Sequence, residues 1–186
     1  MKDLGTVTLE TERLILRKLT RDDAYQAFNN WTNDSETTKY VTWKPHGMVE
    51  NTLELFEKWE KQYDEPYTYR WVVEVKELNQ IIGTIDVVHK SIREKTAEIG
   101  YCYGSKYWGN GYGTEALTRV IDYLLNDVEF DLLEAKHFVT NPASGRVMEK
   151  SGMKYETILR SRMIDQYTGE RVDLKVYSIM REDLYN

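Results

Sequence analysis

Residues 96–125 read TAEIGYCYGSKYWGNGYGTEALTRVIDYLL and contain the most informative pattern in the sequence. The first part of this stretch, residues 96–103, alternates larger apolar side chains with small or polar ones, which indicates a β-strand. Its last part is amphipathic, because apolar side chains recur at helical spacing from Ala116 to Leu125. The stretch is therefore a strand, a glycine-rich loop and a helix in series.

The loop between these two elements, residues 104–114, has the chemistry of an anion site. Three glycines stand in five residues, at Gly109, Gly111 and Gly113. Glycine reaches backbone conformations closed to other residues and lets a bulky anion approach the main chain. The N–H groups and the dipole of the following helix would face that anion. We predict that a phosphate group binds here through main-chain amides.

Two familiar phosphate loops do not fit this segment. A Walker A loop needs Gly-Lys-[Ser/Thr] at the start of its helix, and here Gly113 is followed by Thr114 and Glu115. A dinucleotide fingerprint needs G-x-G-x-x-G and an acid at the end of the next strand. This loop is G-x-G-x-G, and the nearest acid, Glu134, stands at the start of that strand. A glycine-rich connection without a ligand is the alternative interpretation.

Hydrophobic periodicity predicts the other elements. The chain shows no linker, repeat or low-complexity segment, so we expect a single domain over residues 1–186. Its class is α+β, with strands at the centre and helices covering the sheet. Helices are expected over 20–31, 50–63, after the glycine loop and from near Pro142 to Ser151; strands are expected over 12–19, 70–76, 80–89, 96–103 and 133–140, with a C-terminal hairpin over 153–164 and 171–181.

Composition excludes several classes of protein. The 186 residues, 41% hydrophobic and 30% charged, fit one globular domain that is long enough to bury a core. No stretch approaches the roughly 20 apolar residues of a membrane span, and the first residues lack the core of a secretory signal, so we expect a cytoplasmic protein. The net charge of −6 argues against a nucleic-acid partner. A single cysteine and three scattered histidines give no metal-binding spacing.

The segment WGNGYGTEAL resembles the coenzyme A loop of the GCN5-related N-acetyltransferase (GNAT) superfamily, whose pattern is Q/R-x-x-G-x-G/A. Trp108 departs from the Arg or Gln of many members. That substitution is common in the branch of ribosomal-protein alanine and serine N-terminal acetyltransferases (RimJ/RimL type). Three further segments are similar to that branch, in the same order: ETERLILRKLTRDDA, AEIGYCYG and NPASGRVMEKSGMKYE.

The resemblance implies a mixed, mostly antiparallel sheet of about seven strands, flanked by about four helices and splayed between its fourth and fifth strands. It implies acetyl-coenzyme A as cosubstrate, with the pantetheine arm inserted into the splay, and no metal. It also allows a homo-oligomer. The cofactor-binding positions that it implies are Tyr101, Cys102 and Tyr103 on the fourth strand, Trp108, Gly109, Asn110, Gly111, Tyr112, Gly113 and Thr114 in the loop, and Asn141 and Ser144 after the fifth strand.

Two side chains are candidates for the chemistry. Glu98 is the first candidate for the base that accepts the amine's proton, and a solvated strand carboxylate is its alternative interpretation. Ser144 is placed by the resemblance near the cofactor sulfur, where it could donate to the departing thiolate, and a helix N-cap is its alternative. Cys102 could in principle form an acyl-enzyme, but mid-strand placement without a neighbouring His favours a packed side chain.

We therefore expect an enzyme that moves an acetyl group from acetyl-coenzyme A directly to a primary amine in a ternary complex. The branch that it resembles suggests a peptide N-terminal amine as acceptor. A small amine such as a polyamine or an antibiotic is a second possibility. A non-catalytic module that binds acyl-coenzyme A is a third, because fold does not fix function.

Overall fold

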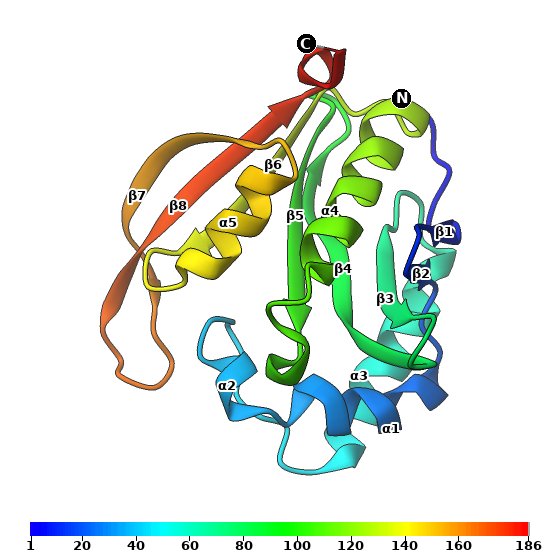
Figure 1. Ribbon diagram of the computed structural model, residues 1–186, viewed down its shortest axis with the longest axis vertical. Coiled ribbons are helices and arrows are strands. Elements are labelled where there is room, and N and C mark those ends of the chain that lie inside the picture. The colour runs from blue at the N-terminus through cyan, green and yellow to red at the C-terminus, as the bar shows by residue number, and fades with distance from the viewer. Residues whose placement is uncertain (186) are drawn as a thin grey trace.

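The computed structural model describes residues 1–185, which form one eight-stranded sheet with helices on both faces (Figure 1). The strands are β1 (Leu9–Glu10), β2 (Leu14–Arg17), β3 (Arg70–Val75), β4 (Gln80–Ser91), β5 (Thr96–Tyr103), β6 (Leu132–Phe138), β7 (Lys154–Ile164) and β8 (Arg171–Met180). The α-helices are α1 (Ala24–Ala27), α2 (Ser35–Thr38), α3 (Val49–Lys61), α4 (Tyr112–Asp122) and α5 (Pro142–Lys150).

The strand order is β1-β2-β3-β4-β5-β6-β8-β7. Only the β5–β6 pair is parallel, because α4 carries the chain back across the sheet between these two strands (Figure 1). The expected mixed, mostly antiparallel sheet is thus confirmed. It has one strand more than expected, since the two-residue β1 pairs with β2, and the four-residue α2 adds a helix. Elements this short leave no periodic signal in a sequence.

The predicted splay lies between β5 and β6. The two strands pair from Thr96 with Leu132 up to Ile99 with Ala135, and the pairing then stops. Residues 100–103 of β5 keep their partners on β4 but have none on β6. One edge of β5 is therefore open beside the glycine loop.

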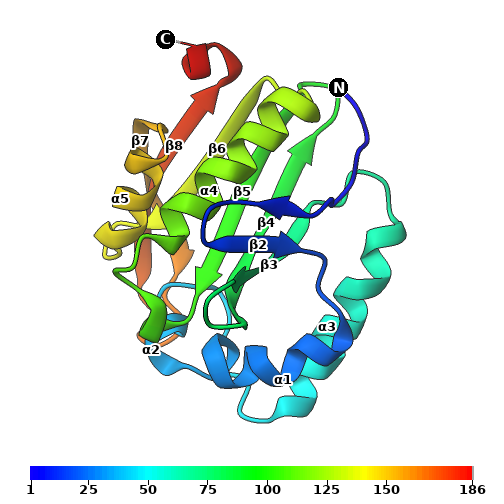
Figure 2. The ribbon, with the colours of Figure 1, turned by 45° about the vertical axis from the view of Figure 1, so that its right-hand side comes forward.

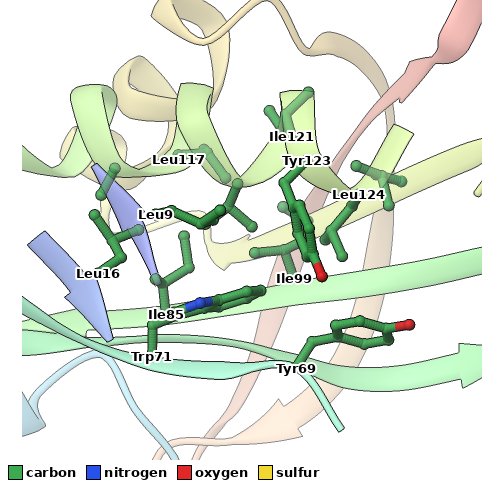
Figure 3. Close-up of a cluster of buried hydrophobic side chains, with 14 of the residues drawn as sticks. Leu9, Leu16, Tyr69, Trp71, Ile85, Ile99, Leu117, Ile121, Tyr123 and Leu124 are labelled. Carbon is green, nitrogen blue, oxygen red and sulfur yellow. The ribbon is translucent and has the colours of Figure 1, made fainter. Parts of the chain in front are cut away.

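Apolar side chains cover both faces of the sheet. On one face, α4 packs its Leu117, Ile121 and the following Leu124 against the strands, as Figure 3 shows. On the other face, α1 and α3 bury a second cluster that includes Trp31 and Phe56. Both helices that flank the splay, α4 and α5, lie on the first face (Figure 2). That face therefore offers two helix ends to a ligand in the gap.

Local chemistry explains where the structure departs from the predicted elements. The helix expected over 20–31 begins after Thr20, whose N–H donates to Asp23 Oδ2 at 2.8 Å. It then divides into a 3₁₀ turn (Arg21–Asp23), α1 and a π turn (Phe28–Thr32). The strand expected over 12–19 is shorter, at Leu14–Arg17. Within residues 1–185, no helix is long and apolar enough to cross a membrane.

Candidate functional site

The glycine loop presents free main-chain donors at the start of α4. Gly109 and Gly111 have φ values of +79° and +81°, a left-handed conformation that only glycine adopts without strain. Gly111 is the N-cap of α4, and Glu115 N–H is the first to bond back to it. The N–H groups of residues 109–114 donate to no other group of residues 1–185. Free N–H groups at a helix N-terminus are an arrangement that suits an anion.

Arg13, next to β2, contacts both this loop and α4. Its guanidinium binds Glu115 in α4 at 2.7 Å and donates to the Asn110 carbonyl at 3.0 Å. The same group lies over the Tyr112 ring, 4.7 Å from its centre. Because the charge of Arg13 is already paired, its contribution is to fix the loop rather than to supply a free cation.

At the open edge of β5, the main-chain N–H and C=O groups of every second residue face the gap. Gly104 N–H donates to Ile82 on β4, and a Cβ on Gly83 would lie 2.1 Å from the Cys102 carbonyl oxygen. The main chain of Cys102 therefore faces β4. Since hydrogen-bonding directions alternate along a strand, the groups of Tyr101 and Tyr103 face the gap instead. The Tyr103 carbonyl already accepts from Trp108 Nε1 at 2.8 Å.

The far wall of the gap is the start of α5. Asn141 is its N-cap, because Asn141 Oδ1 accepts from the Ser144 N–H at 3.4 Å. The N-cap interpretation of Ser144 is therefore wrong: Pro142 occupies the first helical position and Ser144 the third. The Ser144 side chain points to β5, where its Oγ lies 2.9 Å from the Tyr101 hydroxyl oxygen.

The helix α5 can approach β6 closely because residue 145 is a glycine. A Cβ on Gly145 would lie 2.7 Å from His137 Nε2 and 3.3 Å from the Tyr177 hydroxyl. His137 is buried, and its Nδ1 donates to the Phe138 carbonyl at 2.7 Å. Burial lowers the pKa of His137, so a neutral imidazole lies beneath the helix. It supports α5 and has no partner at Nε2 among residues 1–185.

Glu98 lies on the opposite face of β5 from Tyr101. Its carboxylate accepts from the Lys136 ammonium of β6 at 2.7 Å, and both side chains are half-buried. Lys136 follows Ala135, the last residue of β6 that pairs with β5, so this ion pair stands at the point where these two strands diverge. Lys136 lines the cavity described next, whereas Glu98 is not among the lining residues and is linked to the cavity only by its contact with Lys136.

These walls enclose a cavity of about 380 Å³, within the usual range of a small-molecule site. It extends from the glycine loop along β5 and α5 to the segment that holds α2. Its lining contains Lys136, Arg146 and Lys150 and, within residues 1–185, no Asp or Glu. Arg146 and Lys150 form no ion pair with any carboxylate of these residues and stand one helical turn apart on α5. Such unpaired cations favour a polyanionic ligand.

The sequence interpretation missed Arg146 and Lys150 as contributors to this lining. Their i, i+4 spacing on a helix that was itself predicted would have placed them on one face. The direction of that face, however, depends on how α5 packs on β6. No metal-binding group of His, Cys, Asp or Glu occurs in the part of the chain that the structure describes.

The other end of the cavity is lined by Thr37, Tyr40 and Val41. Asp34 joins this segment to the end of β5, because its carboxylate accepts from the Ser105 N–H at 2.9 Å and the Thr37 hydroxyl at 2.7 Å. Partial burial opposes ionisation of Asp34, but these hydrogen bonds outweigh it and lower its pKa to about 2. The wall is thus tied to the strand that forms the gap.

The tip of the β7–β8 hairpin lies beside the segment that holds α2 (Figure 1). The Gln166 side-chain amide donates to the carbonyls of Thr38, Val41 and Trp43 at 3.0, 3.1 and 2.5 Å. The Tyr167 hydroxyl lies 2.5 Å from Thr38 Oγ1. Two segments more than 120 residues apart in the chain therefore shape this end of the cavity.

Cys102 lies on the same face of β5 as Glu98 and packs against the second apolar cluster. Burial raises the pKa of its thiol to about 12, with the nearby carboxylates of Asp34 and Asp86 adding to the effect. A thiol that is protonated at neutral pH is a poor nucleophile. This environment supports a packed side chain.

Comparisons with known proteins agree with this geometry. The acetyltransferase (GNAT) domain model matches residues 13–154. The uncharacterized N-acetyltransferase YoaA of Bacillus subtilis is 32% identical over 173 residues, which are 93% of this chain and 96% of that protein. The family-model match includes every residue that lines the cavity, from Thr37 to Lys150.

Solved structures have the same fold. A GNAT-family acetyltransferase from Bacillus anthracis is 27% identical and superposes with a TM-score of 0.82, over 95% of this chain and 99% of that one. The ribosomal L7/L12 α-N-protein acetyltransferase RimL, solved with coenzyme A, is 16% identical with a TM-score of 0.82, over 94% and 98% of the two chains. The chain described here belongs to the GNAT family and is an acetyl-coenzyme A-dependent acetyltransferase.

Proposed function

We propose that this enzyme transfers the acetyl group directly to the α-amine of a peptide N-terminus. The observation that carries the proposal is the absence of Asp and Glu from the cavity lining within residues 1–185. A polyamine or an aminoglycoside carries several positive charges, and a site for it would supply carboxylates. An acceptor with one reactive amine needs none in the lining. RimL, which has this fold, acts on a protein N-terminus by its name.

The energetics of deprotonation favour the same acceptor. An amine must lose its proton before it attacks the thioester. At pH 7 this costs about 1 kcal/mol for an α-amine of pKa about 7.7–8.0, and about 4.6 kcal/mol for a lysine side chain of pKa about 10.4. The Glu98 carboxylate, held by Lys136, would act on the amine through water. A base that acts in this way suits the α-amine better than a lysine side chain, because the α-amine is easier to deprotonate.

The residues of the gap divide the remaining work. The diphosphate binds to the amides of residues 109–114, with Arg146 and Lys150 beside it, and the pantetheine arm pairs with the free edge of β5 at Tyr101 and Tyr103. Asn141 fixes the start of α5. The amine nitrogen attacks the thioester carbon, its proton passes to Glu98 through water, and the C–S bond breaks. Ser144 then donates to the departing sulfur, so that the products are an amide and a free thiol.

Thiol release from acetyl-coenzyme A tests this proposal. The acceptors are short peptides with a free N-terminus, the same peptides acetylated at the N-terminus but carrying an internal lysine, and spermidine. We expect release only with the first group. Release with spermidine alone would replace the proposal by a small-amine acceptor. Binding of the cofactor without release for any amine would favour a non-catalytic module.

A further inference from the structure

We propose that Tyr101 is a positioning residue that holds the Ser144 hydroxyl at the gap, an inference that rests on the proposed transfer to an amine. The Tyr101 hydroxyl oxygen lies 3.0 Å from the Ser144 carbonyl oxygen and 2.9 Å from Ser144 Oγ. It thus contacts both oxygen atoms of Ser144. Both side chains line the cavity.

The position of the Tyr101 ring is itself fixed by packing. Its ring centre lies 5.8 Å from that of Tyr103, two residues further along β5. Its hydroxyl reaches α5, which follows β6 in the chain. Tyr101 therefore spans the splay on the side of α4 and α5, where β5 and β6 no longer share hydrogen bonds. Because the ring is fixed by packing, the position of its hydroxyl is also fixed, at little cost in conformational entropy.

The hydrogen-bond inventory gives this contact two arrangements. A carbonyl only accepts, and a tyrosine hydroxyl has a single proton. When Tyr101 donates to the Ser144 carbonyl, the Ser144 hydroxyl can donate to the Tyr101 oxygen. When Tyr101 donates to Ser144 Oγ, the Ser144 proton is released for another acceptor. The thiolate that forms as the C–S bond breaks is such an acceptor, so the second arrangement serves the transfer.

Tyr101 keeps its own proton throughout. Burial raises the pKa of Tyr101 well above its ordinary value, so its hydroxyl stays neutral over the working range of pH. Any proton that Ser144 passes to sulfur is replaced from solvent, into which Glu98 releases the proton of the amine. Tyr101 acts through Ser144 alone.

The variant Tyr101→Phe removes one oxygen and leaves the ring. We expect kcat to fall by about tenfold, and by a constant factor from pH 6 to 9, while the Kd of acetyl-coenzyme A changes by less than about twofold. Tyr101→Phe combined with Ser144→Ala should be no slower than Ser144→Ala alone. The matched control is Tyr177→Phe, because the Tyr177 hydroxyl also binds α5, at Glu149 Oε1 3.0 Å away, without contacting Ser144. Its kcat should equal that of the wild type.

A crystal structure of Tyr101→Phe with coenzyme A shows the position of the Ser144 side chain and does not depend on an activity assay. We expect the Ser144 side chain to leave the rotamer that faces β5. An unchanged rotamer, losses that add in the double variant, or an equal loss in Tyr177→Phe would overturn the inference. A wild-type enzyme that acetylates no amine would instead refute the proposed function, and the rotamer would still decide the positioning of Ser144.

Discussion

The Lys136 ammonium lies 2.7 Å from Glu98 Oε2 at the point where β5 and β6 stop pairing. The two side chains are 26% and 20% exposed, so water reaches this pair only in part. Partial burial strengthens such a contact relative to a fully exposed ion pair. The contact keeps a carboxylate at the edge of the gap, on the face of β5 opposite Tyr101.

Glu98→Gln tests whether this carboxylate is the base. The substitution keeps the size of the side chain and removes its negative charge. We expect kcat to fall at least tenfold with no loss of affinity for acetyl-coenzyme A, since base catalysis contributes about 10²–10⁴-fold. The matched control is Glu134→Gln on β6, the residue in register with Glu98. Unchanged turnover in Glu98→Gln would remove Glu98 from the mechanism.

Gly111→Ala tests the conformation of the anion loop. With φ at +81°, an alanine is strained by about 1–3 kcal/mol, and relief of that strain would turn the N–H groups away from the diphosphate. We expect the Kd of acetyl-coenzyme A, measured by calorimetry, to rise about tenfold. Gly47→Ala is the control, because Gly47 has φ +72° and no neighbouring atom within 4 Å, away from the loop. Equal affinity in both variants would contradict the role of the loop.

Gly145→Ala tests the close packing of α5. The new methyl group would lie 2.7 Å from His137 Nε2, so helix and strand must separate. Overpacking of this kind costs about 1–3 kcal/mol of the free energy of unfolding, which urea denaturation measures. Adding His137→Ala removes the obstructing ring and should recover part of that loss. A Gly145→Ala protein as stable as the wild type would show that α5 has room to move.

Asp34 predicts a dependence of stability on pH. Its pKa is about 2 in the folded protein and about 3.9 in an unfolded chain, so its contribution is complete above about pH 5 and is lost as pH falls from there towards 2. After allowance for solvent screening we expect on the order of 1 kcal/mol. Asp34→Asn should therefore be less stable than the wild type at pH 7, and the difference should shrink below about pH 5. A difference that is constant from pH 7 to 2.5 would contradict this account.

Gln166→Ala tests the hairpin contact with the acceptor end. The variant leaves the carbonyls of Thr38, Val41 and Trp43 without their donor, so the wall over the cavity loosens. We expect the KM of the amine to rise about threefold or more, with the Kd of acetyl-coenzyme A unchanged. Thr168→Ala, at the same tip but hydrogen-bonded only within the turn, is the control. A rise in the cofactor Kd instead would place the effect at the wrong end of the cavity.

Local patterns predicted much of the fold and one end of the site. Alternation in residues 70–76, 80–89 and 96–103 was enough to place β3, β4 and β5, because these central strands have buried side chains. The three glycines before a helix predicted the donor-rich loop that the structure shows. Both patterns are local, because each depends only on residues that are close together in the chain.

The remaining features depend on contacts between distant segments. Gln166 binds carbonyls about 125 residues earlier in the chain, and main-chain acceptors leave no trace in side-chain pattern. The interpretation of Ser144 as a helix N-cap was wrong because Asn141, which precedes Pro142, is the better cap. The contact between Tyr101 and Ser144 exists only because α5 packs across the gap.

A crystal structure of the wild-type protein with acetyl-coenzyme A would show where the cofactor binds. We expect the diphosphate on the N–H groups of residues 109–114 and the thioester between β5 and β6, with its sulfur beside Ser144. A diphosphate bound elsewhere, or those N–H groups taken by another part of the chain, would contradict this expectation.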